Sequence, residues 1–453
     1  MGQAYALACF LAALAAAAFL DRLTSVLLVL STFLFAVVCR YSNRYLAGDA
    51  GQARFTFWLC LTGSCVFGLV LAQNLLYFSL AWCGVSLSLH QLLQFYRYRP
   101  GALLAARKKF LISRLGDAAL AGSLILTYRQ FHTWDFQRIF IAAEQLRTAG
   151  ISHLPQSISW ICALLVFAAL LKSAQFPFHS WLPDTMETPT PVSALMHAGI
   201  INAGGILIIR LNPLISLSPT SLLVLCIIGS FTALFASIVM LTQTSVKRCL
   251  AFSTVAQMGF MMLECGLGAF HLALLHLVAH SLYKAHAFLS SGSAVVAKPQ
   301  PQKKSVTAFT IAVGLLFAFV TAPLVAWWLG IDPRKEPALI AIFSLALAQM
   351  LWAARPTPLS FALGFILSLT YFTLGRAAEQ IVKPLSIEIG WLTLLLMAAF
   401  AVIAVAQSQL PRLTYTSFGR RLYVHARNGF YINTLANRIT AFVWPVTVSL
   451  EEN

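Results

Sequence analysis

The sequence predicts an all-α polytopic membrane protein with about fourteen transmembrane helices. Of its 453 residues, 59% are hydrophobic and only 10% are charged, whereas soluble domains carry about 25% charged residues. Many apolar runs reach the roughly 20 residues that cross a bilayer. An ordinary soluble domain is therefore excluded. The first run, Tyr5 to Leu20, has no basic segment before it, so we expect a retained helix and not a cleaved signal peptide.

The expected spans cover most of the chain and are joined by short connections. In order, they run roughly over 4–20, 23–39, 55–72, 74–95, 110–128, 157–178, 190–211, 219–242, 249–266, 269–295, 307–329, 338–353, 358–375 and 389–407. The following basic residues of the connections all come after even-numbered spans and so lie on one side: Arg40, Arg44, Arg54, Arg97, Arg99, Arg107, Lys108, Lys109, Lys247, Arg248, Lys298, Lys303, Lys304, Arg412, Arg420, Arg421 and Arg427. Because positive residues mark cytoplasmic loops, both termini are predicted to be cytoplasmic. This bias, and not nucleic-acid binding, explains the net charge of +17.

No linker divides the apolar part, so we expect one transmembrane domain, 1–411. An amphipathic tail, 412–453, follows and would lie on the membrane surface or on a partner. The loop at 129–156 carries spaced aromatic residues, which is typical of an interfacial helix.

The sixth and eleventh predicted spans both contain a proline, Pro177 and Pro323, and they cross the membrane in opposite directions. Paired interrupted helices of opposite sense indicate inverted repeats around a midplane site. We therefore expect two inverted five-helix repeats, approximately 55–211 and 219–353, each with a broken helix.

Lys172 lies deep in the sixth span, five residues before Pro177. A lysine at the bilayer centre costs about 2.5–3.5 kcal/mol, and Pro177 should leave the carbonyl of Ser173 without its helix donor. Broken helices at membrane depth persist where they are buried in protein or line a wet cavity. We interpret this stretch as a candidate ion pathway. The alternative is that Lys172 snorkels to the interface.

The tenth span carries His276, His280 and Lys284 at i, i+4 and i+8, which places them in one stripe on one helix face. Histidine and a desolvated lysine can exchange protons near neutral pH, so the stripe predicts a proton relay. Simple packing of the histidines is the alternative. Two histidines four residues apart can also share zinc, but no glutamate lies near them on this helix.

Acidic residues inside spans are few. Arg114 and Asp117 are three residues apart near the start of the fifth span, a spacing that predicts an ion pair. The pair could anchor the helix end or take part in ion movement. Glu264 ends the ninth span, where we expect it at the outer interface, with a possible role in ion exit.

The seventh span contains His197, with glycines nearby that allow close helix contact. Asp184 and Glu187 lie in the short loop before it. They could guide cations to the mouth of a pathway, or they could cap the seventh helix.

No cofactor is expected on this chain. The nine cysteines lie mostly in apolar runs, without a C-x-x-C or Cys/His spacing. No nucleotide-binding fingerprint or nucleophile constellation is present either, so an enzymatic role is not expected.

Four motifs in order carry a resemblance to a known family: RKKFLISRLGD, KSAQFPFHSWLPDTMETPTPVSALMHAG, SVKRCLAFSTVAQMGFMML and HLVAHSLYKAHAFLSSGS. They resemble the proton-translocating antiporter family, which includes antiporter-like subunits of respiratory complex I and of Mrp-type sodium/proton antiporters. The resemblance covers most of residues 40–300. It implies that Lys172 is the channel lysine of the broken helix, and that Lys284 is the central lysine with His280 beside it.

The chain departs from the family pattern at two positions. Cys83 stands where members commonly have the glutamate partner of the broken-helix lysine. The family's third lysine is also absent, and the nearest aligned residue is Asp332, with Arg334 and Lys335 close by. The usual three-lysine relay is therefore not intact.

Within the family, the chain is most similar to the DabB group, the membrane subunits of two-component inorganic-carbon uptake systems. That resemblance implies a cation-conducting subunit, for H+ or Na+, in the cell inner membrane. Its flow would drive CO2 hydration on a cytoplasmic DabA-like partner similar to carbonic anhydrase, which would hold the zinc. One alternative is an ion-pumping subunit of a complex I or Mrp assembly. Another is an assembly protein that conducts nothing.

Overall fold

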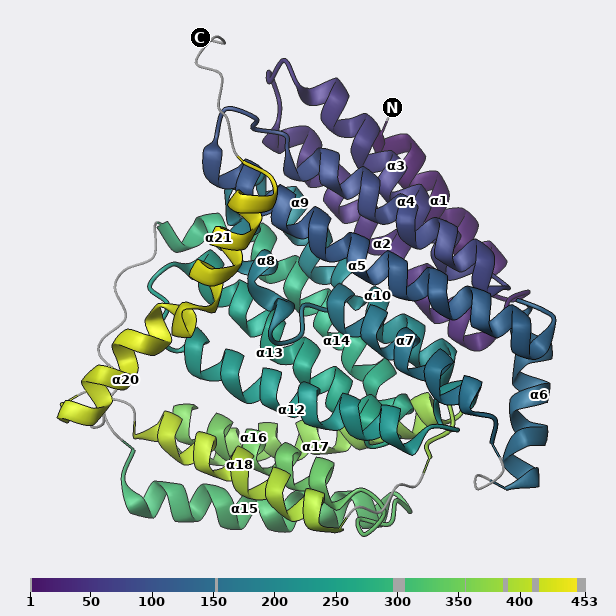
Figure 1. Ribbon diagram of the computed structural model, residues 1–453. Helices are drawn as coiled ribbons and strands as arrows, with labels where there is room; N and C mark the ends of the chain where they lie inside the picture. Colours follow the sequence, from purple (N-terminus) through teal and green to yellow (C-terminus); the bar gives the residue numbers. More distant parts are fainter. Residues whose placement is uncertain are drawn as a thin grey trace. The chain divides into compact units, whose positions relative to one another are not determined.

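The computed structural model describes residues 2–150, 154–295, 306–354, 356–385, 390–409 and 415–445. In these ranges the backbone is almost entirely helical, and the only β-type pairing is an isolated bridge between Asn74 and Asp135. Ten helices are long and apolar enough to cross a membrane, and three shorter apolar helices accompany them. The predicted all-α, multi-pass membrane protein is confirmed (Figure 1).

Each expected span corresponds to a helix or to a broken series of helices. They are α1 (Gly2–Ala16), α2 (Arg22–Tyr45), α3 (Gln52–Leu71), α4 (Leu75–Leu93), α5 (Pro100–Phe131), α7 (Gln156–Lys172), α9 with α10 (Thr190–Ala198 and Ala203–Arg210), α12 (Pro219–Met240), α13 (Val246–Gly266), α14 (Phe270–Leu289), α15 (Ala308–Trp328), α16 (Pro337–Ala354), α17 (Pro358–Glu379) and α18 (Gly390–Ser408). Capping side chains define several starts. Asp21 and Asn74 each accept a hydrogen bond from the amide three residues later, at 2.9 and 2.8 Å.

The helices form two compact units. The first comprises Met1–Gly266, His276–Val296 and Tyr431–Asn453, and the second comprises Leu267–Leu275 and Ala297–Phe430. In the first unit, α12 and α13 cross very closely. A methyl group added at Gly229 or Gly259 would lie 2.6 or 2.5 Å from a backbone nitrogen of the other helix. Such close glycine contacts are typical of helix pairs in membranes.

Large apolar side chains lie on the outer surface of the first unit as well as in its core. Phe57, Leu80 and Ile125 are 60%, 60% and 55% exposed. Extensive exposed apolar surface marks a membrane-facing or protein-facing region, and lipid solvates it in a multi-pass protein.

The sixth span is interrupted, but earlier than Pro177. Helix α7 ends at Lys172, and Ala174 takes a left-handed conformation with φ +50°. The chain then continues through the short segments η2 (Phe178–Ser180), α8 (Trp181–Asp184) and η3 (Thr185–Glu187). The carbonyl of Ser173, expected to be left without a partner, accepts a hydrogen bond from Gln175 Nε2 at 2.8 Å.

The expected break at Pro323 is wrong, because α15 continues through this residue from Ala308 to Trp328. A proline removes one helix hydrogen bond, here to the carbonyl of Phe319, and membrane helices tolerate such a loss when neighbours compensate.

The seventh span is broken instead, which the sequence analysis did not predict. Helix α9 ends at Ala198, the turn η4 (Ile200–Asn202) follows Gly199, and α10 begins at Ala203. Helix α10 approaches α7 so closely that a methyl group at Gly204 would lie 2.4 Å from the backbone oxygen of Ala169.

Two short amphipathic helices lie in the tail, α20 (Ser417–Arg427) and α21 (Ile432–Val443). In the first unit, α21 packs against α5, as Figure 1 shows in yellow. Helix α6 (Phe136–Ala149) lies where the interfacial helix was expected. Lys298, Lys303, Lys304, Arg412 and the tail beyond position 445 lie outside the described residues.

Candidate ion pathway

Lys172 lies inside the protein, at the C-terminal end of α7. Its side chain lies against α4, where Nζ donates to Ser86 Oγ at 2.7 Å and to the Trp82 carbonyl at 3.4 Å. The Trp82 ring lies 4.4 Å from the ammonium, which adds a cation–π contact. Because Lys172 is only 7% exposed and its polar contacts are internal, the structure does not support the snorkelling alternative.

The expected ion pair on α5 is present, with Arg114 Nη2 and Asp117 Oδ2 2.6 Å apart. Asp117 is also the carboxylate that acts electrostatically on Lys172 and on Cys83. The position that holds the family's glutamate is thus a thiol here, and α5 supplies the nearest negative charge. The Asp117 carboxylate lies closer to Arg114 than to Lys172.

The stripe on α14 faces the interior of the first unit. Lys284 is fully buried, and its Nζ donates to the Leu250 carbonyl at 3.1 Å and to the Ser253 hydroxyl, both on α13. His280 Nε2 lies 3.3 Å from the carbonyl of His197. The rings of His276 and His280 are 6.0 Å apart, so the three groups line one side of the helix.

Glu264 lies two residues before the end of α13 and is 2% exposed. Its Oε2 lies 2.9 Å from Nδ1 of His276 on α14. A buried carboxylate needs such a partner. Glu264 thereby joins the α14 stripe directly.

The break in the seventh span leaves backbone carbonyls that accept hydrogen bonds from nearby side chains, one of them on α14. Backbone carbonyls freed at a helix end must find other donors. His280 lies against the carbonyl of His197, and Asn202 Nδ2 donates to the carbonyl of Ala198 at 2.9 Å. His197 is itself fully buried, with Nδ1 3.1 Å from the Thr254 hydroxyl.

Two separate interhelical hydrogen bonds of the first unit involve residues near the two lysines. Ser173, next to Lys172, donates to the carbonyl of Ile201 at 2.9 Å. The neighbouring Asn202 donates to Ser281 Oγ at 2.8 Å, and Ser281 lies one turn before Lys284 on α14. Oδ1 of Asn202 and Nε2 of His197 are buried without a protein partner among the described residues. Buried polar atoms are rarely left unpaired, so water is the expected partner here.

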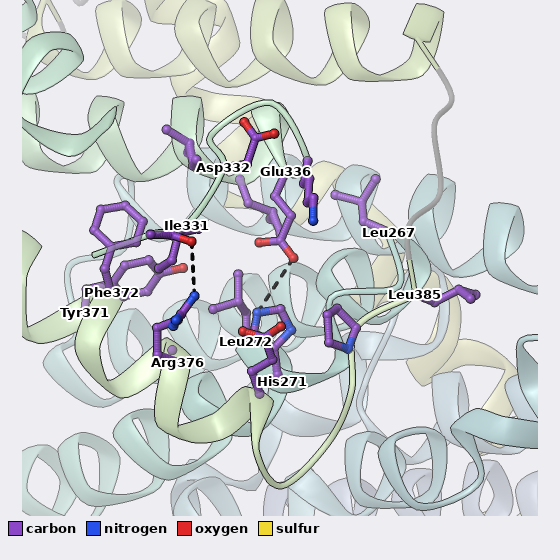
Figure 2. A pocket seen from close by; sticks show the side chains of 17 residues that line it. Leu267, His271, Leu272, Ile331, Asp332, Glu336, Tyr371, Phe372, Arg376 and Leu385 are labelled. Carbon is purple, nitrogen blue, oxygen red and sulfur yellow. Dashed lines mark hydrogen bonds and ion pairs between the residues drawn. The ribbon is translucent and has the colours of Figure 1, made fainter. Parts of the chain in front are cut away.

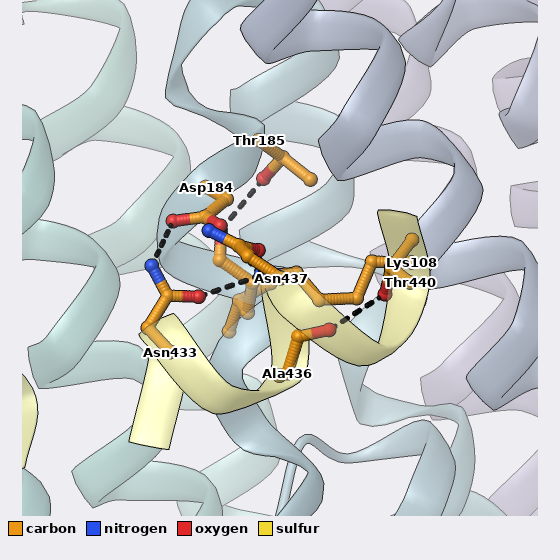
Figure 3. A network of polar contacts seen from close by, with 8 residues as sticks. Lys108, Asp184, Thr185, Asn433, Ala436, Asn437 and Thr440 are labelled. Atoms are coloured by element: carbon orange, nitrogen blue, oxygen red, sulfur yellow. Dashed lines mark hydrogen bonds and ion pairs between the residues drawn. The ribbon is translucent and has the colours of Figure 1, made fainter. Parts of the chain in front are cut away.

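Asp184 neither caps the seventh helix nor lies free in its loop. It binds Lys108, whose Nζ donates to Asp184 Oδ2 at 2.5 Å and to Oδ1 of Asn433 and Asn437 at 2.6 Å each. Figure 3 shows this network between α5, α8 and α21. Glu187 makes no capping bond to α9 either.

The second unit contains a cavity of about 120 Å³ around His271, lined by apolar and charged side chains (Figure 2). His271 Nε2 lies 3.7 Å from Glu336 Oε1, and Arg376 donates to the Gly330 carbonyl at 3.1 Å. Asp332, which the sequence analysis aligned near the absent third lysine, lines this cavity together with Lys335 and Glu379. The sequence analysis did not single out His271 or Glu336.

Lys108 and Lys109 were also missed, because they were assigned to a cytoplasmic connection. They are 1% and 2% exposed. Helix α5 begins at Pro100 and not near residue 110, which places both lysines in its third turn. Proline is favoured at the first position of a helix, so Pro100 was the available signal. In the described part of the chain, no three His, Cys, Asp or Glu side chains converge to hold a metal ion.

Comparison with known proteins identifies the family of this chain. The family model described as "NADH:quinone oxidoreductase/Mrp antiporter, TM" matches residues 72–333, more than half of the chain. The chain belongs to this family. The antiporter-like family resemblance found in the sequence is thereby confirmed, and the protein is an antiporter-like membrane subunit.

Relatives in the antiporter family cover most of the chain. It is 40% identical to "Probable inorganic carbon transporter subunit DabB2" of Halothiobacillus neapolitanus, over 94% of this chain and 80% of the relative. It is 36% identical to "Probable inorganic carbon transporter subunit DabB" of Hydrogenovibrio crunogenus, over 94% and 83%. Among solved structures, a chain of the Mrp complex from Dietzia sp. DQ12-45-1b shares the fold, with a TM-score of 0.64, 23% identity, and coverage of 95% of this chain and 53% of that chain.

Proposed function

We propose that this antiporter-like subunit conducts a cation, H+, for an energy-coupled inorganic-carbon uptake pump in the cell inner membrane, with both termini in the cytoplasm. The observation that carries the conducting role is the pair of buried ammonium groups, Lys172 at the broken end of α7 and Lys284 within α14, each held by a serine hydroxyl. Groups of this kind inside membranes are costly and mark ion paths.

The hydrogen bonds of Ser173 to Ile201 and of Asn202 to Ser281 place polar groups of the broken seventh span beside both lysine-bearing segments, which supports proton movement between the lysines through water. Short hydrogen-bonded steps between exchangeable groups are what proton transfer requires. The Glu264–His276 pair extends the same stripe by a further carboxylate and imidazole. The ion enters or leaves through these groups.

Two observations favour inorganic-carbon uptake over redox-driven pumping. The relatives that match 94% of the chain at 36–40% identity are named as inorganic carbon transporter subunits. Cys83 in place of the family's glutamate also alters the environment of Lys172. In this proposal, ion flow drives one-way CO2 hydration on a cytoplasmic partner similar to carbonic anhydrase. That partner carries the zinc, and this chain carries neither cofactor nor catalytic site.

The test combines transport with partner identification. Lys172→Met and Lys284→Met are expected to abolish bicarbonate accumulation in cells at low CO2, whereas Lys383→Met, at an exposed position, leaves it unchanged. Purification of the wild-type chain from native membranes should yield a large cytoplasmic protein that contains zinc. Full accumulation in both lysine variants would refute the conducting role.

The second candidate is an ion-pumping subunit of a complex I or Mrp assembly, for H+ or Na+. The family match over residues 72–333 favours it, because the family is described by those assemblies. Co-purification with redox subunits or small antiporter subunits, and with no zinc protein, would decide for this candidate.

A further inference from the structure

Lys109 on α5 is a further buried lysine of the first unit, in addition to Lys108, Lys172 and Lys284. It is 2% exposed, and its Nζ donates to the backbone carbonyl of Ser86 at 2.9 Å. A lysine buried this deeply persists where a partner or a function compensates for its desolvation. Its single protein acceptor is a neutral carbonyl.

Ser86 joins Lys109 to Lys172. The serine is 1% exposed, and its hydroxyl accepts from Lys172 Nζ at 2.7 Å while its carbonyl accepts from Lys109. Two ammonium groups from two helices therefore contact two different oxygen atoms of one residue of α4. One serine separates the two nitrogen atoms.

The charges around this serine do not balance. Lys172 faces Lys109 from α7, His90 faces it from α4, and Arg114 and Asp117 face it from α5 itself. Asp117 is the one carboxylate among them, and it contacts Arg114 at 2.6 Å. Among the described residues, no carboxylate oxygen lies within 4 Å of either lysine nitrogen. Two like charges in a desolvated site disfavour each other.

Lys108, the preceding residue, is a buried lysine with a full set of acceptors. Its ammonium has three N–H donors, and these have three acceptors: a carboxylate, Asp184, and two amides, Asn433 and Asn437 (Figure 3). Lys109 has neither a carboxylate nor a full set of acceptors. The two neighbouring lysines therefore serve different purposes.

We propose that Lys109 is a relay residue, and that Lys109, Ser86 and Lys172 together hold one transferable proton. The proposal rests on the proposed conducting role of Lys172. In the transfer, the Lys109 amine turns from the Ser86 carbonyl to the hydroxyl of the same residue. An N–H bond of the Lys172 ammonium then breaks as its proton passes to that hydroxyl, and the hydroxyl proton passes on to the lone pair of Lys109. Only H+ moves, so charge passes from one lysine to the other with no change of oxidation state.

The experiment measures H+ uptake with a pH-sensitive dye in inverted membrane vesicles from cells that produce the intact system. Lys109→Met should lower the initial rate by about tenfold or more, as expected for loss of a positioned proton acceptor. Lys109→Arg should lower it similarly, because arginine keeps its charge but does not release its proton. Lys383→Met, exposed on the second unit, is the matched control and should retain the wild-type rate.

Ser86→Ala provides a test that does not depend on how a lysine variant folds. It removes the hydroxyl that binds Lys172 and keeps the carbonyl that binds Lys109. A reduced H+ uptake rate with a normal protein level supports the relay. Wild-type uptake in Lys109→Arg and in Ser86→Ala, together with loss of uptake in Lys172→Met, would overturn the relay and leave the proposed function intact. Wild-type uptake in Lys172→Met and Lys284→Met would overturn the proposed function itself.

Discussion

The network around Lys108 predicts how tightly helix α21 is held. Lys108 Nζ has acceptors at 2.5, 2.6 and 2.6 Å, and two of these are the side-chain oxygens of Asn433 and Asn437. A hydrogen bond to a charged group contributes about 1.5–3 kcal/mol. Water replaces the lost acceptor only when α21 has detached. Asn433→Ala or Asn437→Ala should therefore raise the detached fraction of α21 by about ten- to a hundredfold.

Detachment can be measured by the labelling rate of a cysteine in place of Thr440, which is 4% exposed on α21. When α21 re-attaches faster than maleimide reacts with the cysteine, the labelling rate at that position is proportional to the detached fraction of α21. Asn428→Ala is the matched control, since that side chain is exposed and bonds only within its own helix. It should leave the labelling rate unchanged.

A double-mutant cycle separates the hydrogen bond from other effects of the substitution. In a Lys108→Met background the charge is gone, so Asn437→Ala, whose side chain bonds only Lys108 among the described residues, should change the labelling rate by less than about threefold. A change below about twofold in the wild-type background would refute the reasoning. So would an undiminished effect in the Lys108→Met background.

Three further predictions follow from the first unit. Glu264→Gln removes the carboxylate that pairs with His276 at 2.9 Å and should lower the H+ uptake rate severalfold at a normal protein level. If the two residues act together, the double variant with His276→Gln should have nearly the same uptake rate as Glu264→Gln alone. Gly204→Ala places a methyl group 2.4 Å from a backbone oxygen of α7 and should destabilise the detergent-solubilised protein by about 1–3 kcal/mol in thermal unfolding, whereas Gly390→Ala, with open space around it, should not. Asn202→Ala removes hydrogen bonds to Ala198 and Ser281, and uptake equal to wild type would show that this link carries no protons.

The helices could be predicted from the sequence because the length and apolar character of each run decide locally whether it can cross the membrane. A span needs about twenty apolar residues and satisfies its backbone groups internally. Helix ends were less certain, since they depend on single residues. Pro323 did not break α15, whereas Gly199 interrupted the seventh span. Whether a helix continues past such a residue depends on what its neighbours offer to the freed backbone groups.

The residues of the candidate site differ in the same way, because some could be predicted from a single segment and others depend on how the helices pack. Lys172, His280 and Lys284 stand out in the sequence because a charged or titratable group inside an apolar run is costly wherever its partners lie. Lys109 did not, because its run was assumed to begin ten residues later than it does. Ser86 carries no sequence signal at all, since serines are common in membrane helices.

The sequence by itself determined that this chain crosses the membrane many times and holds ammonium groups at depth, because both follow from composition along one segment. Only the tertiary structure decided which groups meet. Glu264 pairs with His276, Lys108 binds Asp184, and Ser86 contacts two lysines. These contacts join different helices, and a buried charge acquires its partner from whichever neighbour packing brings close.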